Sequence, residues 1–198
     1  AGPPIGRTFL RVLDVTEIIE KFDFTENEIK IALTYFRQKK LQEGEYFLKE
    51  GEFCKSIAFV SYGAIIYYEN KEGEEKINDF AFENDWISQL ESLNNGTPSK
   101  LSIKTIEKTS LWVISRDNLE TLKKEVYKMN TLQARITEAY FIKANNRISN
   151  FAHLSAKERY KEEITANPEL ALRIPQYYLA SYLGIKPQSL SRIRAENK

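Results

Sequence analysis

Short runs of β-branched and aromatic residues, separated by glycines, occupy the middle of the chain. This pattern is typical of strands joined by turns. The runs predict strands over the ranges Arg37–Leu41, Tyr46–Lys49, Ser56–Tyr62, Ala64–Asn70, Glu75–Phe82, Leu101–Ile106 and Ser110–Ser115. The turn at Lys71–Glu74 makes two of these strands the arms of a hairpin. Strands at this spacing predict an antiparallel β-roll of the jelly-roll kind.

Helical spacing of apolar residues flanks the predicted strands. Val15–Glu20 and Glu26–Tyr35 precede them as short lead-in helices, and Thr25 has the position of an N-cap with Glu28 in capping-box register. Arg116–Val126 begins a helix after the last strand. The chain therefore predicts an α+β fold in which helices flank one β-roll.

A long helix is predicted from Lys128 to about His153, because this stretch contains no proline or glycine. Its apolar residues form one drifting stripe, made up of Met129, Leu132, Ile136, Tyr140, Ala144, Ile148 and Phe151. The stripe fits either packing on the helix's own domain or a seam with a second copy of the chain. We favour dimerisation, because a helix that links two domains has little of its own chain to cover both flanks. Lys143, Asn146 and Asn150 argue against a long, purely apolar coiled coil.

The C-terminal part of the chain has the pattern of a helix-turn-helix. Ser155 is the N-cap of a helix that begins at Ala156, with Glu158 as its capping-box partner. Further along, residues 176–193 form two helices joined by a turn at Gly184. Pro187 suits the first turn of the second helix. Apolar residues fall on the facing sides of these two helices, namely Leu179, Leu183, Ile185, Leu190 and Ile193. This arrangement predicts a helix-turn-helix.

The second of these helices carries polar side chains suited to the major groove of DNA. Gln188, Ser189 and Arg192 are the candidates for base contact, because glutamine pairs with adenine and arginine with guanine. The candidates for contact with the phosphate backbone are Lys186, Ser191 and Arg194, with Arg173 and Lys198 as further cations. Residues 174–198 carry a side-chain charge of +3, from four cations against Glu196. A hairpin used for protein contact, or a solvated charged face, is the alternative, and the pattern favours DNA.

Composition narrows the chemistry of the chain. The 198 residues are 42% hydrophobic and 29% charged with a net charge of +1, so binding to nucleic acid must come from a local patch. The lone Cys54 excludes an internal disulfide, a four-cysteine iron–sulfur cluster and a cysteine-based zinc site within one chain. With His153 as the one histidine, the chain cannot build a metal centre of two or three histidines, and a catalytic triad has no other imidazole to use. We therefore expect no enzyme, no metal and no cofactor, and structural roles for both residues.

The same composition bears on location. No apolar run is long enough to cross a bilayer, and Ala1–Pro4 lack the charged-then-apolar signature of a secretion signal. A single cysteine fits a reducing compartment. The sequence therefore predicts a cytoplasmic protein without a membrane segment.

Two stretches, Leu41–Glu52 in the strands and Ile174–Ile193 in the helix-turn-helix, resemble the Crp/Fnr superfamily of bacterial transcription regulators. The resemblance extends over nearly the whole chain. It implies a cyclic-nucleotide-binding-type β-roll over residues 1–126, a linking and dimerising helix over 127–153 and a DNA-binding domain over 154–198. It also implies a homodimer that reads palindromic double-stranded DNA, with RNA polymerase as a candidate partner. Since the chain ends soon after the second helix of the motif, little or no wing is expected.

The resemblance also identifies a candidate effector pocket with altered ligands. Members that bind cyclic nucleotides hold the ribose with Gly-Glu and the phosphate with Arg followed by Ser or Thr. Ser88-Gln89 and Ser99-Lys100 occupy these places here, with Trp86 beside them. The phosphate-clamping Arg is missing, and a buried anion without a paired cation is costly. Cyclic AMP is therefore not the expected ligand, and the pocket is either vestigial or tuned to another small molecule.

These observations predict a dimeric, sequence-specific DNA-binding transcription regulator with an altered sensor domain. The alternative is a ligand-binding regulatory module whose helical tail contacts a protein partner without DNA. Selection of a palindromic site from random duplexes distinguishes the two.

Overall fold

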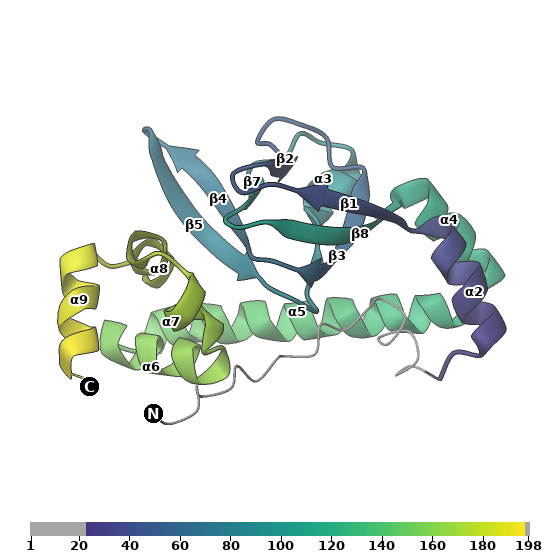
Figure 1. Ribbon diagram of the computed structural model, residues 1–198. Coiled ribbons are helices and arrows are strands. Elements are labelled where there is room, and N and C mark those ends of the chain that lie inside the picture. The colour runs from purple at the N-terminus through teal and green to yellow at the C-terminus, as the bar shows by residue number, and fades with distance from the viewer. Residues whose placement is uncertain (1–22, 197–198) are drawn as a thin grey trace, which may run out of the picture.

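Two four-stranded antiparallel sheets face each other in a β-roll (Figure 1). The computed structural model describes residues 23–196. One sheet has the strand order β1-β8-β3-β6 and the other the order β2-β7-β4-β5. The strands are β1 (Arg37–Leu41), β2 (Tyr46–Leu48), β3 (Ser56–Tyr62), β4 (Ile65–Lys71), β5 (Glu74–Ala81), β6 (Trp86–Ile87), β7 (Ser102–Thr105) and β8 (Thr109–Ser115). The predicted α+β fold with an antiparallel roll is confirmed.

Every strand that the sequence predicts is present, with ends shifted by a residue or two. The sequence missed β6 because two residues are too few to show alternation, and it missed the short helix α3 (Leu90–Asn95) that follows. Alternate side chains of the strands fill the space between the sheets, where Ala58, Val60, Ile65, Ile103 and Leu111 are buried. The tight β4–β5 hairpin confirms the turn expected around Gly73.

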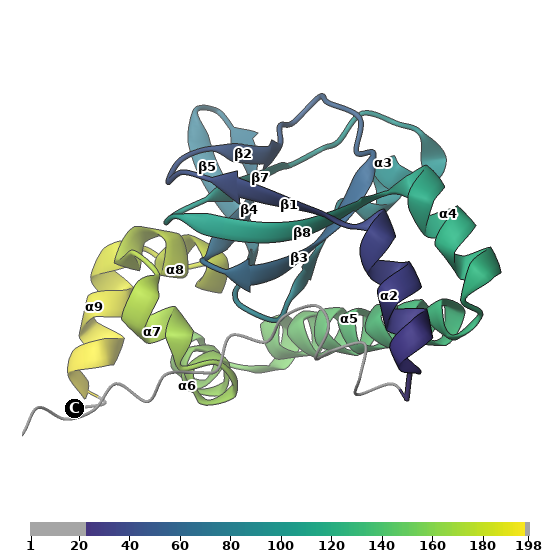
Figure 2. The same ribbon diagram turned by 45° about the vertical axis from the view of Figure 1, so that its right-hand side comes forward.

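Two helices cover one end of the roll. These are α2 (Glu26–Tyr35) and α4 (Arg116–Glu125), which lie side by side in Figure 2, and the Tyr35 hydroxyl donates to the Glu125 carboxylate at 2.7 Å. The predicted capping box at the start of α2 is present, since Thr25 accepts from the Glu28 N–H while Glu28 accepts from the Thr25 N–H. The predicted helix Val15–Glu20 lies outside the described residues.

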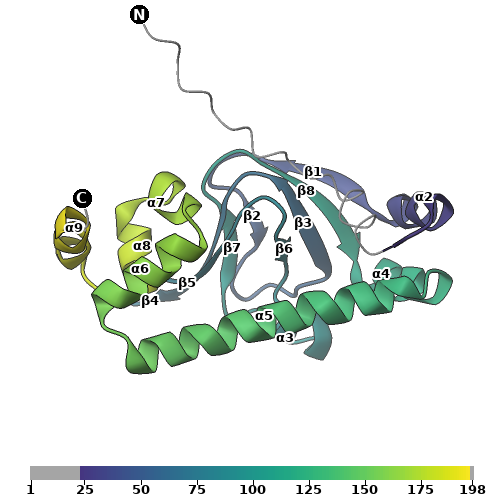
Figure 3. The ribbon, with the colours of Figure 1, turned by 90° about the horizontal axis from the view of Figure 1, so that it is seen from below.

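Helix α5 (Lys128–His153) runs along the underside of the roll, as Figure 3 shows. Its first turns are buried against their own chain, where Met129 and Leu132 pack in a cluster with α2, α4 and β8. The first half of the predicted dimer seam therefore packs on the roll of its own chain and is not available to a second copy. Beyond this contact the helix exposes the last two apolar residues of the stripe, Ile148 and Phe151, together with Phe141 and Ile142.

Four helices complete the chain: α6 (Ala156–Ala166), α7 (Glu169–Arg173), α8 (Gln176–Leu183) and α9 (Pro187–Glu196). The predicted capping box of Ser155 and Glu158 opens α6. Helices α8 and α9 form the predicted helix-turn-helix, and Gly184 ends α8 at a φ of 69°. A Cβ at Gly184 would lie 3.1 Å from the Phe151 ring, so both the turn and the close approach of α5 require glycine.

The helix-turn-helix packs directly on the β4–β5 hairpin of the roll. The Ile77 N–H donates to the Ser181 hydroxyl at 3.0 Å, and the rings of Phe80 and Tyr182 lie 5.0 Å apart. One hydrophobic cluster contains side chains of β4, β5, α6, α7, α8 and α9. The predicted domain limits at residues 126 and 153 stay predictions, but a shared core joins the roll to the C-terminal helices.

Two further expectations concern a membrane segment and the wing. None of the described helices has the length and apolar character needed to span a membrane. The described residues end within the chain at Glu196, so the expected lack of a wing stays a prediction.

Candidate functional site

Helix α9 presents the polar face that the sequence assigns to DNA. Leu190 is fully buried against α8 and anchors the opposite side of the helix. Gln188 and Arg192, one turn apart, are exposed, as is Ser191 beside them. Ser189 is half-buried on the flank of this face. The structure therefore brings two of the three predicted base contacts together on one exposed surface at the outer edge of the molecule (Figure 1).

The predicted phosphate contacts separate into two groups. Lys186 is exposed in the turn before α9, whereas Arg194 is half-buried toward the Leu190 side. Lys198 lies outside the described residues. The expectation that Arg173 meets phosphate is wrong for this structure, because its guanidinium is held by carboxylates on the roll.

Arg173 lies in a cluster of three carboxylates between α7 and the roll. Its guanidinium contacts Glu83 at 2.6 Å and Glu169 at 3.1 Å, and it also pairs with Glu107. Burial opposes ionisation of Glu83, but the Arg173 guanidinium and the Gly63 N–H outweigh it and hold the pKa of that carboxyl below its ordinary value. Sequence patterns do not reveal this cluster, because Glu83 and Glu107 come from loops that are distant in the chain and Glu169 alone is a neighbour on α7.

A second candidate site is a cavity of about 250 Å³ between the roll and α5. Residues of strands β4, β5 and β6 line one side of it, and residues of the first turns of α5 line the other. Its walls are mostly apolar, with Phe36, Phe80, Trp86, Ile114, Met129 and Ile136 among them. The sequence missed the contribution of α5, because the pattern there assigned Ile136 and Tyr140 to a dimer seam.

The acidic groups beside the cavity have distinct environments. Asp79 is paired with the Lys143 ammonium, 2.9 Å from each carboxylate oxygen. Burial raises the pKa of the Asp85 carboxyl above its ordinary value of 3.8, although the Phe82 N–H and Lys143 oppose this shift. Burial also raises the pKa of the Tyr140 phenol, whose hydroxyl donates to the Trp86 carbonyl at 2.5 Å. Among the described residues, Asp79 is therefore the charged residue on the cavity wall, and Lys143 pairs with its carboxylate.

The comparisons with known proteins agree with the two-part architecture. Residues 38–125 match the family model of the cyclic nucleotide-binding domain. A CooA variant from Carboxydothermus hydrogenoformans has a TM-score of 0.71 at 15% identity, covering 94% of this chain and 85% of its own. FixK2 from Bradyrhizobium japonicum has a TM-score of 0.67 at 19% identity, covering 81% and 83% respectively. A Crp/Fnr-family protein from Eubacterium rectale has a TM-score of 0.65 at 16% identity, covering 88% and 83%.

The chain has the Crp/Fnr fold. The strand-rich segment is similar to the cyclic nucleotide-binding domain family. No curated protein matches the chain in sequence. The described part of the chain ends with α9, and the cavity lies between the segment that the family model matches and α5, which follows that segment.

Within this Crp/Fnr fold, the five predicted effector residues do not form one pocket. Trp86 and Ser88 line the cavity. Gln89 caps α3 instead, accepting from the Ser92 N–H at 2.5 Å, and the Ser99 hydroxyl donates to the Leu101 carbonyl at 2.6 Å. Lys100 is 70% exposed and pairs with Glu91 at 2.6 Å. At the two positions expected to hold ribose and phosphate, Gln89, Ser99 and Lys100 therefore make local contacts and do not line the cavity.

The lone cysteine and histidine show no site of their own in the structure. Cys54 is buried, and its N–H donates to the Ser92 hydroxyl at 2.8 Å. His153 is exposed at the last residue of α5. Within residues 23–196, no group of three or more His, Cys, Asp or Glu residues is arranged to hold a metal ion.

Proposed function

We propose that this protein is a dimeric, sequence-specific DNA-binding transcription regulator with a sensor domain of altered ligand specificity. One observation carries the proposal: the second helix of a helix-turn-helix holds Gln188 and Arg192 on an exposed face, while Leu190 fixes the other side of that helix in the core. A helix anchored in this way enters the major groove with its polar face toward the base edges.

The chemistry of the exposed face suits base readout. The Gln188 amide pairs bidentately with adenine, and the Arg192 guanidinium with the O6 and N7 atoms of guanine. Lys186 and Ser191 flank these side chains and suit contact with phosphate oxygens. The local surplus of cations supplies the attraction that the nearly neutral chain as a whole lacks.

Dimerisation is supported by the distal part of α5. Phe141 and Ile148 are 68% and 69% exposed, and they lie seven residues apart. Ala134, one heptad earlier, is also exposed. A spacing of seven residues is that of a coiled-coil seam, and two copies of α5 paired along it bury this face. A pair of α9 helices then reads two half-sites of a palindrome.

The structure also supports the proposal that cyclic AMP is not the effector. Cyclic AMP carries a phosphate anion, and in the described residues the cavity has no lysine or arginine on its wall. Lys100, the nearest replacement in the sequence, is paired with Glu91 at the surface. An anion in this cavity would therefore lack a counter-charge.

Selection from random duplexes tests the proposal. The purified chain is incubated with a pool of random double-stranded DNA, and bound molecules are recovered and sequenced over several rounds. We expect a palindromic consensus that binds at least a thousandfold more tightly than unrelated duplex, as for specific DNA-binding proteins in general. Recovery of no consensus at low ionic strength contradicts sequence-specific binding.

A protein partner for the helical tail is the second candidate function. Leu172 on α7 and Tyr177 on α8 are large apolar side chains with 77% and 57% exposure. Exposed apolar surface is a feature of protein interaction sites. If the protein is a transcription regulator, as proposed above, RNA polymerase is the candidate protein partner. Binding of a protein partner by the helical tail, together with no enriched DNA sequence in the selection, favours this second function.

A further inference from the structure

The cavity beneath the roll has room for a small organic molecule. Its volume is about 250 Å³. For comparison, an engineered protein cavity of about 150 Å³, lined by apolar side chains, takes up benzene. The cavity therefore accommodates a ligand of one or two fused rings.

The walls favour an aromatic occupant. Phe36 and Trp86 lie on one side with ring centroids 6.1 Å apart, and Phe80 lies on another. Met129 on α5 adds a polarisable sulfur. Aromatic rings are attracted to each other edge-to-face or offset, and thioethers pack well against ring edges. A flat apolar ring thus gains more from these walls than from water.

Most polar groups on the wall already have partners within the protein. The Ser88 hydroxyl donates to the Ser56 carbonyl at 3.1 Å, and the Thr137 hydroxyl donates to the Gln133 carbonyl at 2.9 Å. The Tyr140 hydroxyl donates to Trp86, as described above. The wall therefore offers few donors to a ligand. The side-chain amide of Gln133, half-buried on α5, is the group placed to bond one polar substituent.

The wall offers no counter-charge to an anion. Among the described residues, the charged side chain on the wall is that of Asp79, and the Lys143 ammonium that pairs with it lines a neighbouring cleft instead. An anionic ligand would meet this carboxylate without a cation on the cavity wall, and burial of such a charge is costly.

We propose that the cavity binds an uncharged aromatic molecule of one or two rings that carries at most one hydrogen-bonding substituent. Such a ligand contacts both the roll and α5, which links the sensor half to the helix-turn-helix. The inference concerns ligand binding alone and does not rest on the DNA-binding function. It can therefore fail while DNA selection succeeds, and the reverse is equally possible.

A pair of probes that differ in charge tests the proposal with the full chain. Isothermal titration calorimetry at pH 7 compares 2-naphthol, which is uncharged, with 2-naphthoate, its anionic counterpart. We expect 2-naphthol to bind at least tenfold more tightly, with a negative heat-capacity change from apolar burial. Cyclic AMP should not displace it. Equal or tighter binding of 2-naphthoate, displacement by cyclic AMP, or no binding of either probe overturns the proposal.

Matched variants on α5 locate the bound probe. Ile136 lines the cavity and is half-buried, whereas Ala144 is exposed two turns further along the same helix. We expect Ile136→Trp, which fills the cavity, to weaken 2-naphthol binding at least tenfold, and Ala144→Trp to change it less than twofold. Unchanged binding to a folded Ile136→Trp protein overturns the assignment.

A second variant covers the case in which Ile136→Trp does not fold. Asp79→Asn removes the carboxylate on the wall and releases Lys143. We expect the affinity for 2-naphthoate to rise at least threefold and that for 2-naphthol to change less than twofold. An unchanged preference between the two probes shows that the charge of the wall does not select the ligand, and this result overturns that part of the proposal.

Discussion

Arg173 on α7 and Glu83 after β5 form a two-pronged ion pair, with contacts of 2.6 and 3.0 Å between their nitrogen and oxygen atoms. These residues are 90 positions apart in the chain. Their side chains are 21% and 17% exposed, so solvent screens the pair only in part. The pair holds the C-terminal helices against the roll, and the Glu107 and Glu169 carboxylates complete the site.

Arg173→Ala should loosen this interface. Removal of the guanidinium leaves three carboxylates close together, so we expect the free energy of unfolding to fall by about 2 kcal/mol. Urea denaturation followed by circular dichroism measures the change. Lys157→Ala is the control, because the Lys157–Glu196 pair is about half exposed on both sides and should contribute much less to stability. Equal losses in the two variants would contradict a special role for Arg173.

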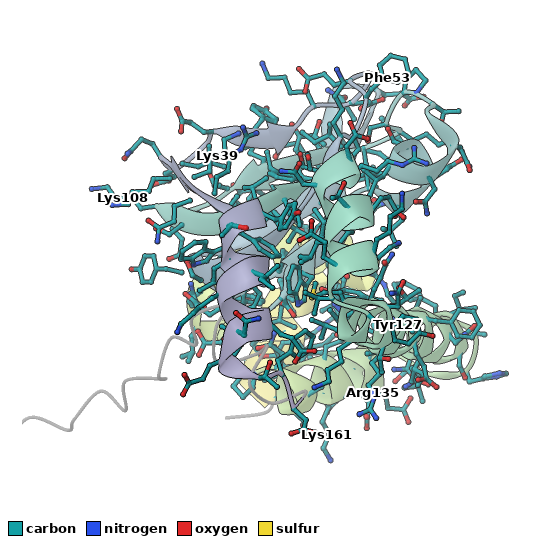
Figure 4. The ribbon with its side chains drawn as sticks, turned by 90° about the vertical axis from the view of Figure 1, so that its right-hand side faces the viewer. Lys39, Phe53, Lys108, Tyr127, Arg135 and Lys161 are labelled. Carbon is teal, nitrogen blue, oxygen red and sulfur yellow. The ribbon has the colours of Figure 1, made fainter. Side chains whose placement is uncertain are left out.

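Arg192→Ala should weaken binding to the selected DNA site by about 1–3 kcal/mol and relax base choice at one position. Fluorescence anisotropy with the consensus and with single-base variants measures both effects. Lys39→Ala removes the same charge from the exposed strand β1 (Figure 4), far from α9, and should change affinity much less. An equal loss on every DNA sequence would assign Arg192 to the phosphate backbone instead.

Phe141→Glu should prevent pairing of α5 with a second copy. The side chain is exposed in the single chain, so the substitution leaves the fold intact, but two charges would face each other at the proposed seam. Sedimentation velocity should show self-association weakened at least tenfold. Lys161→Glu, at an exposed position on α6, is the control for a charge change. A Phe141→Glu protein that remains dimeric places the dimer interface elsewhere.

Asp85→Asn should stabilise the protein at neutral pH. Burial raises the folded-state pKa of Asp85 above its unfolded value, so folding favours the protonated form and the ionised form costs stability. This cost is fully present above the folded pKa and disappears as pH falls through the unfolded value. Asparagine retains an oxygen to accept from the Phe82 N–H. Thermal unfolding should show a higher Tm for the variant at pH 7, with the difference shrinking toward pH 3.

The local elements were predictable from the sequence because short-range patterns encode them. The capping boxes at Thr25 and Ser155 and the turn at Gly184 depend on residues three or four positions apart. The strands of the roll follow from alternation and from turn residues, and the two-residue strand β6 was missed because it has neither. The exposed face of α9 follows from helical periodicity around Leu190.

The sequence by itself determined the β-roll, the long helix and the helix-turn-helix, because each depends on propensity and periodicity within a few residues. Tertiary structure alone decided which surface each helix meets. A helical stripe fixes which residues share a face, but it does not say whether that face covers its own roll, as Met129 does, or remains exposed, as Ile148 does. Likewise a cation such as Arg173 looks free for phosphate until folding places distant carboxylates around it, since electrostatic energy depends on distance in space and not along the chain.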